Sequence, residues 1–126
     1  MPLVRIDLRA GKSPEYLRAI TDSLYAAMRE SFAVPEDDRF MLIHQHAAEE
    51  FIYDAGYLGV RRSEDLVIVQ ITANNTRTLE QKKAFFADAA RRLSASPGLR
   101  PEDVLISLVE VPKENWSFGL GLAQYA

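Results

Sequence analysis

The chain has 126 residues, of which 48% are hydrophobic and 26% charged, with a net charge of −3 and no cysteine. Disulfides and thiolate metal sites are thereby excluded, and a negative chain without a basic run is a poor candidate for binding nucleic acid. No apolar run could span a bilayer, so we expect one soluble cytoplasmic domain over residues 1–126, with no membrane or nucleic-acid partner.

The first third of the chain predicts a strand, a helix and a second strand. Apolar residues alternate over residues 3–8, which indicates a strand with one buried face. Ser13 and Pro14 are types preferred at the cap and the first position of a helix. The helix is expected to end near Phe32, and residues 40–44 then form the second strand.

A second set of the same elements follows a connector, residues 45–65, in which we expect a short extra strand or a turn. Residues 66–73 form an apolar strand, and Thr78 with Gln81 has the spacing of a helix capping box. A Pro-Gly pair at 97–98 ends that helix, and residues 104–111 form the fourth strand.

The two sets align with each other at an offset of about 65 residues, which indicates an internal duplication. The Pro-Glu-Asp triplet at 35–37, for example, aligns with the same triplet at 101–103. We therefore predict two pseudo-repeats, over about residues 2–45 and 66–111, followed by an aromatic, glycine-containing tail at 112–126 that packs on the rest of the protein.

A strand–helix–strand unit has parallel strands joined by a right-handed crossover. Two such units side by side predict an α+β fold, with a four-stranded mixed sheet and both helices on one face. The other face would be bare, and the strands at 66–73 and 104–111 read as apolar on both sides. We therefore expect a homo-oligomer that covers this face.

The two aspartates before the second strand align with residues of different types in the second repeat. Asp37 aligns with Asp103, which suggests a shared turn or cap role, whereas Asp38 aligns with Val104 in a core strand. A carboxylate in the position where the sister repeat buries valine requires another reason, and we take Asp38 as a candidate functional residue.

Pro2 and Asp38 both lie at strand beginnings, at the same edge of the predicted sheet. If the first strand is antiparallel to the third, the segment from Asn74 to Arg77 arrives at that edge too. An amine, a carboxylate and a guanidinium would then converge. Removal of Met1 would leave Pro2 as a secondary amine, whose pKa burial lowers and a neighbouring carboxylate raises.

These residue types suit proton-transfer chemistry on a carboxylate-bearing substrate. Pro2 would act as the acid or base. Asp38 would orient water, shuttle a proton or keep the amine charged, and Arg77 would bind the substrate carboxylate through two hydrogen bonds.

Several segments resemble the tautomerase superfamily, and more narrowly the malonate semialdehyde decarboxylases and their homologues. The resemblance lies in VPEDDRF (34–40), IHQH (43–46), TRTLEQK (76–82), PEDVLISLVEV (101–111) and NWSFGLG (115–121), besides the Pro2-Leu3-Val4 start. It implies a trimer of duplicated β-α-β protomers of the tautomerase/MIF-like type, with Pro2 catalytic and assisted by Asp38.

In the decarboxylases, two arginines flank the substrate. The resemblance places Arg77 at the second and Asn74 at the first, so one arginine is missing here. It also places Trp116 beside the active site, and we assign Asn74, Trp116 and Phe118 to substrate binding.

The activity implied is decarboxylation or hydration of a small oxo acid, without a cofactor. The alternative is keto–enol tautomerisation of a 2-oxo acid such as a phenylpyruvate-type substrate. Another is a non-catalytic oligomeric homologue, in which Trp116, Phe118 and Tyr125 would simply pack in an interface.

A metal enzyme is a further alternative, because His44 and His46 lie two apart on a strand, near Glu49 and Glu50. No third histidine exists in the chain. We therefore expect no metal, and interpret both side chains as hydrogen-bonded strand residues.

Overall fold

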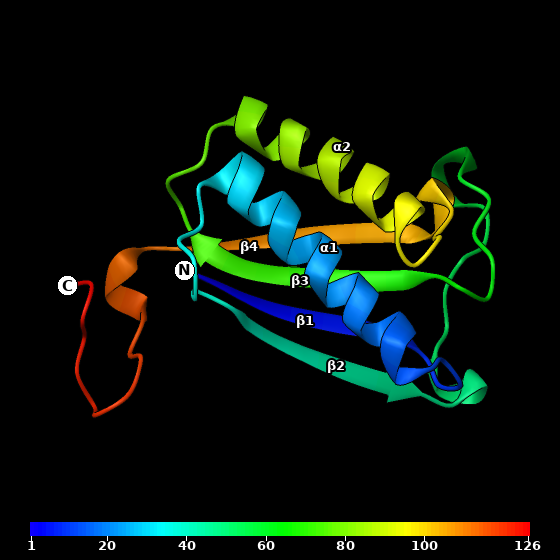
Figure 1. Cartoon of the computed structure of the whole chain (residues 1–126), viewed down its shortest axis with the longest axis horizontal. Helices are drawn as coiled ribbons and strands as arrows, with labels where there is room; N and C mark the ends of the chain where they lie inside the picture. Colours follow the sequence, from blue (N-terminus) through cyan, green and yellow to red (C-terminus); the bar gives the residue numbers. More distant parts are fainter.

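The computed structural model describes residues 1–126 as a four-stranded mixed sheet with both helices on one face, in the strand order β2-β1-β3-β4 (Figure 1). The elements are β1 (Pro2–Arg9), α1 (Pro14–Phe32), β2 (Phe40–His46), β3 (Val67–Asn74), α2 (Leu79–Ala95) and β4 (Val104–Val111). β1 is parallel to β2 and antiparallel to β3, and β3 is parallel to β4. The predicted fold class, with its tandem β-α-β units, is confirmed.

Both helices begin at the residues that the sequence indicates. The hydroxyl of Ser13 accepts a hydrogen bond from the backbone N–H of Tyr16, and Pro14 occupies the first helical position. Thr78 and Gln81 form the reciprocal capping box of α2. These caps satisfy backbone donors that the first helical turn cannot pair internally.

The core lies between the helices and the sheet. Strand residues alternate between this core and the opposite face, so every second residue of β1 and β3 is buried. The largest fully buried side chains include Val4, Ile6, Leu8, Ile20, Leu24, Met28, Leu66, Val67, Val69, Ile71, Phe85 and Leu93. Burying each such side chain stabilises the folded state by roughly 1.5–3 kcal/mol, before the loss of conformational entropy is subtracted.

The face of the sheet opposite the helices has a mixed character. Phe40, Leu42 and Val109 are exposed there, at 52%, 44% and 38%. Gln70 of β3 and its neighbour Ser107 of β4, however, put polar groups on the same face. The expectation that β3 and β4 are apolar on both sides is therefore wrong at these two positions.

The connector contains two short 3₁₀ turns, Ala48–Glu50 and Tyr57–Gly59, and no additional strand. β2 continues to His46, two residues beyond the predicted end. The longer strand is paired along its length, since His46 lies opposite Arg9 of β1. Neither helix has the length and apolar character needed to cross a membrane.

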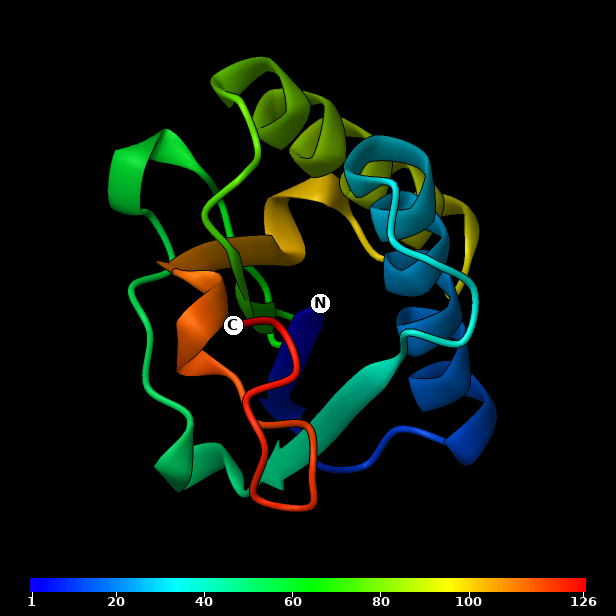
Figure 2. The ribbon, with the colours of Figure 1, turned by 90° about the vertical axis from the view of Figure 1, so that its left-hand side faces the viewer.

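One edge of the sheet gathers most of the predicted functional segments. The beginnings of β1 and β2 lie there beside the ends of β3 and β4, and the C-terminal segment folds over the same edge (Figures 1 and 2). The end of α1 and the start of α2 complete it (Figure 1). The antiparallel pairing of β1 with β3 therefore brings Arg77 to the edge at which Pro2 begins the sheet.

Candidate active site

The amine at the start of the chain lies beside Asp38. The Met1 nitrogen is 3.5 Å from Asp38 Oδ2, and the side chains of Met1 and Asp38 are only 7% and 13% exposed. Asp38 Oδ1 is buried without a hydrogen-bond partner. Pro2 itself is buried, on the same face of β1 as Val4. A buried carboxylate with a free lone pair thus faces the first amine of the chain.

The turn that carries Asp38 is braced against α1. Asp37 has a left-handed backbone, with φ of 70°, and its N–H donates to the Tyr25 hydroxyl at 3.2 Å. Arg39 forms an ion pair with Asp22 of α1 at 2.5 Å and lies over the Tyr25 ring, 4.8 Å from its centroid. These contacts on both sides of Asp38 direct its carboxylate toward the amine.

Arg77 lies between the end of α1 and the beginning of α2. Its Nη2 donates to the Phe32 carbonyl at 3.0 Å, and the guanidinium lies over the Phe32 ring. That carbonyl is one of the unpaired acceptors at a helix C-terminus, so the contact also caps α1. Burial lowers the pKa of Arg77, but a guanidinium stays charged in proteins. Its other N–H groups are available to an anion.

The Met1 amine has a pKa below its ordinary value, and burial is the largest cause. The positive charges of Arg77 and Lys113 lower the pKa further, whereas the charge and hydrogen bond of Asp38 raise it. Burial and the two cations together outweigh the carboxylate. The net effect shifts the Met1 amine toward its neutral, basic form, while Asp38 favours the charged form.

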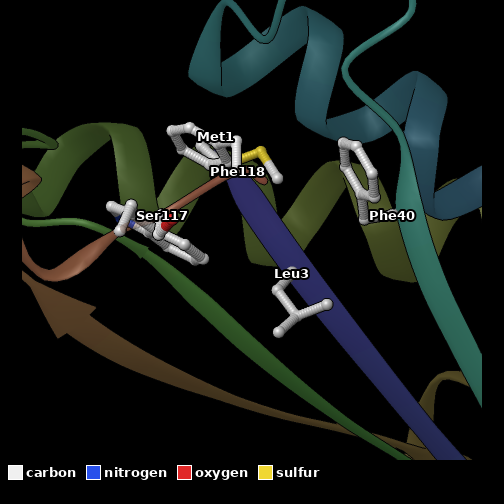
Figure 3. A pocket seen from close by; sticks show the side chains of 6 residues that line it. Met1, Leu3, Phe40, Ser117 and Phe118 are labelled. Carbon is white, nitrogen blue, oxygen red and sulfur yellow. The ribbon is translucent and has the colours of Figure 1, made fainter. Parts of the chain in front are cut away.

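A cavity of about 230 Å³ opens next to the amine. Figure 3 shows Ser117 and Phe118 at one end of it, Phe40 of β2 at the other, and Met1 and Leu3 between them. Trp116 completes the lining. The walls are mostly apolar, so the cavity suits the hydrocarbon part of a ligand whose charged part lies toward the amine.

Asn74 contacts Trp116. Its Oδ1 accepts a hydrogen bond from the indole Nε1 at 2.8 Å, and Asn74 is 6% exposed. Asn74 also borders a small second cavity together with Arg77. The indole ring of Trp116 stacks on Phe118, with centroids 5.6 Å apart.

The six residues proposed from the sequence all lie at this edge of the sheet, while four contributors were missed. Leu3, Phe40 and Ser117 line the cavity, and the charge of Lys113 lowers the pKa of the amine. The alternation of β1 and β2 contained a signal for the first two, because it puts Leu3 and Phe40 on the face opposite the core, and they pair across the strands. No sequence pattern pointed to Lys113.

The two histidines lie away from this edge, toward the end of β2. His46 Nε2 is 2.6 Å from Asp7 Oδ1, and His44 Nε2 is 3.3 Å from Arg5 Nη1. No group of three or more His, Cys, Asp or Glu side chains lies close enough together to hold a metal ion.

Asp38→Asn is expected to lower the pKa of the amine further, because it removes the anion that raises that pKa. In the protein that retains Met1, the pH at which an acylating reagent modifies the amine at half its maximal rate should therefore decrease. The rate can be followed by mass spectrometry of the N-terminal peptide. Asp37→Asn, at an exposed neighbouring position, is the control. An unchanged or higher pH in Asp38→Asn would contradict the assigned electrostatics.

Comparisons with known proteins extend over nearly the whole chain. A family model described as a tautomerase enzyme matches residues 38–119, and a second with the same description matches residues 2–61. The probable tautomerase YusQ of Bacillus subtilis (strain 168) is 43% identical over 124 residues, which cover 98% of each chain.

Solved structures show the same arrangement. A malonate semialdehyde decarboxylase with decarboxylase and hydratase activities has a TM-score of 0.92 and 32% identity, covering 98% of this chain and 95% of that one. A fused 4-OT symmetric trimer has a TM-score of 0.79 and 26% identity, covering 98% and 97%. Because a family model spans well over half of the chain and the Bacillus subtilis protein matches it nearly end to end, the chain belongs to the tautomerase family.

Proposed function

We propose that this protein catalyses cofactor-independent proton transfer on a small oxo acid, with the amine of Pro2 as its acid–base group. The observation that carries the proposal is the cluster at the start of β1, where the first amine of the chain lies 3.5 Å from Asp38 and its pKa responds to Arg77. An amine, a carboxylate and a guanidinium beside an apolar cavity are the groups that such a reaction needs.

Removal of Met1 would make the Pro2 nitrogen the first amine. Pro2 is buried at the beginning of a central strand, so its ring holds the nitrogen in a fixed position. The unpaired Asp38 Oδ1 would then have an N–H donor available. Satisfying a buried carboxylate oxygen in this way avoids the cost of leaving it without a partner.

The reaction that the site supports best is keto–enol tautomerisation of a 2-oxo acid. Arg77 would bind the substrate carboxylate, and the neutral amine would take a proton from the carbon next to the carbonyl. The electron pair of the broken C–H bond would form the C=C bond, the π electrons of the carbonyl would move to its oxygen, and the protonated amine would return the proton to that oxygen to give the enol. The lowered pKa of the Met1 amine beside Asp38 supports this direction for a Pro2 amine in the same surroundings, because only a neutral amine can accept that proton.

Decarboxylation or hydration of a 3-oxo acid is the second candidate. The likeness to a malonate semialdehyde decarboxylase favours it, and Asp38 raises the pKa of the amine toward the charged form that would polarise the carbonyl. In that reaction the C–C bond to the carboxylate breaks, its electrons form an enolate, and carbon dioxide leaves. The asparagine at position 74 weighs against this candidate, because it supplies no second cation.

The likeness to a fused 4-OT protein supports a homotrimer, since that structure is a symmetric trimer. The face of the sheet opposite the helices exposes Phe40, Leu42 and Val109, which gives it apolar surface to bury. In a trimer, this face would lie against neighbouring copies of the chain.

Pro2→Ala is expected to reduce kcat/KM on 2-oxo acids by a factor on the order of 10² or more, since an acyclic primary amine replaces the fixed secondary amine. Intact-mass measurement first establishes that Met1 has been removed from both proteins. Pro14→Ala, at the start of α1, is the matched control and should retain activity. Equal turnover by Pro2→Ala and wild type would reject the mechanism.

Arg77→Ala is expected to weaken kcat/KM about 10- to 100-fold for oxo acids, but much less for their methyl esters, because the guanidinium pairs with a charged carboxylate. Arg61→Ala, at an exposed position, is the control. Arg77 also caps α1, so urea unfolding of the same variants separates lost stability from lost binding. Similar losses on acids and esters would exclude the carboxylate-binding role.

Light scattering coupled to size-exclusion chromatography should give a mass three times that of a single chain. Leu42→Glu puts a charge on the open face of the sheet and should lower that mass. Leu79→Glu, at a 62% exposed position at the start of α2, should not. A single-chain mass for the wild type would contradict the trimer.

A further inference from the structure

The C-terminal residues 116–126 form an aromatic wall that is held together by its own contacts. Trp116 stacks on Phe118, and Phe118 contacts Tyr125 edge to face at a centroid distance of 4.7 Å. Gln124 accepts a hydrogen bond from the Phe118 N–H at 3.0 Å and donates to the Gly119 carbonyl at 2.9 Å. The segment folds back over the sheet edge, toward the N-terminus (Figure 2).

One hydrogen bond joins the aromatic wall to residues 1–111. It is the 2.8 Å bond from Trp116 Nε1 to Asn74 Oδ1; all other hydrogen bonds of residues 116–126 stay within the tail, and no ion pair involves them. Asn74 is the last residue of β3 and is 6% exposed, so its amide is fixed by the sheet. Within a single chain, this bond is therefore the one hydrogen bond that fixes the position of the wall relative to the sheet.

The chemistry of the two groups makes the contact directional. An indole N–H can only donate, so the amide oxygen of Asn74 must face Trp116. A side chain without an acceptor at position 74 would leave a partly buried indole donor unpaired, which is unfavourable. Trp116 and Phe118 both line the cavity beside the amine (Figure 3 labels Phe118). A displacement of the wall would therefore change the shape of that cavity.

We propose that Asn74 is a positioning residue: it docks the aromatic wall against the amine site and thereby selects oxo acids that carry an apolar group of aryl size. Asn74 thus acts through Trp116 and not by touching the substrate. The cavity, at about 230 Å³, exceeds the roughly 150 Å³ that accommodates benzene in a protein interior. The substrate class rests on the proposed function; the docking of the wall does not.

The first arm of the test is spectroscopic and requires no activity. Trp116 is the only tryptophan in the chain, so intrinsic fluorescence reports on the wall alone. Asn74→Ala should shift the emission to longer wavelength and increase quenching by acrylamide, since the indole becomes more accessible to water. Asn74→Asp retains an acceptor oxygen and should restore both readings. Asn75→Ala, at the exposed neighbouring position, is the control.

The second arm compares two substrates. With phenylpyruvate, Asn74→Ala should raise KM about tenfold with little change in kcat, because the aryl group loses its wall. With 2-oxobutanoate, which has no aryl group, the same variant should raise KM several-fold less than it does with phenylpyruvate. Trp116→Phe should show the same pattern. In the Trp116→Phe background, Asn74→Ala should have no additional effect, since the two changes remove one interaction.

Unchanged emission and quenching in Asn74→Ala would overturn the docking role. Equal losses on both substrates, or a lower kcat with an unchanged KM, would overturn the selection of an aryl group. If no oxo acid were turned over by the wild type, the proposed function would fail, and the fluorescence arm would still decide whether Asn74 docks the wall.

Discussion

The burial of the first amine at the edge of a paired sheet is the constraint on which the site depends. β1 lies between β2 and β3, so its first residues cannot move into solvent without losing strand pairing on both sides. The parallel register with β2 brings Asp38 to the amine, and the antiparallel register with β3 pairs Pro2 with Ala73. Arg77 follows directly after that strand. Topology alone thus assembles three groups from segments far apart in the chain.

The burial of the amine beside Asp38 and Arg77 changes its pKa. Removing a charge from water is unfavourable, so burial favours the neutral amine, and two nearby cations act in the same direction. Asp38 opposes this shift without reversing it. We interpret Asp38 as the group that keeps the amine protonatable, so that a proton taken from one atom of the substrate can be returned to another.

The fold was largely predictable because its signals are local. Alternation identified the strands, and Ser13 and Thr78 identified the starts of the helices. Comparison of the two repeats singled out Asp38, since the duplicated position is a core valine. The polar residues Gln70 and Ser107 on the open face went unnoticed, because apolar neighbours dominate the composition of both strands.

The less predictable parts depend on long-range contacts. The direction of the pKa shift depends on how deeply the amine is buried, which no sequence pattern gives. The aromatic wall has no periodicity, and the hydrogen bond that joins it to β3 links Asn74 and Trp116, which are 42 positions apart. Lys113 acts on the amine only because the chain turns back after β4.

A titration of the Pro2 nitrogen tests the central claim most directly. In the protein without Met1, labelled with ¹⁵N-proline, the chemical shift of the N-terminal nitrogen can be followed against pH in the folded state and in urea. We predict a lower pKa in the folded protein than in the unfolded chain, because burial disfavours the charged amine. An equal or higher pKa in the folded protein would show that the amine is not a buried base and would contradict the account.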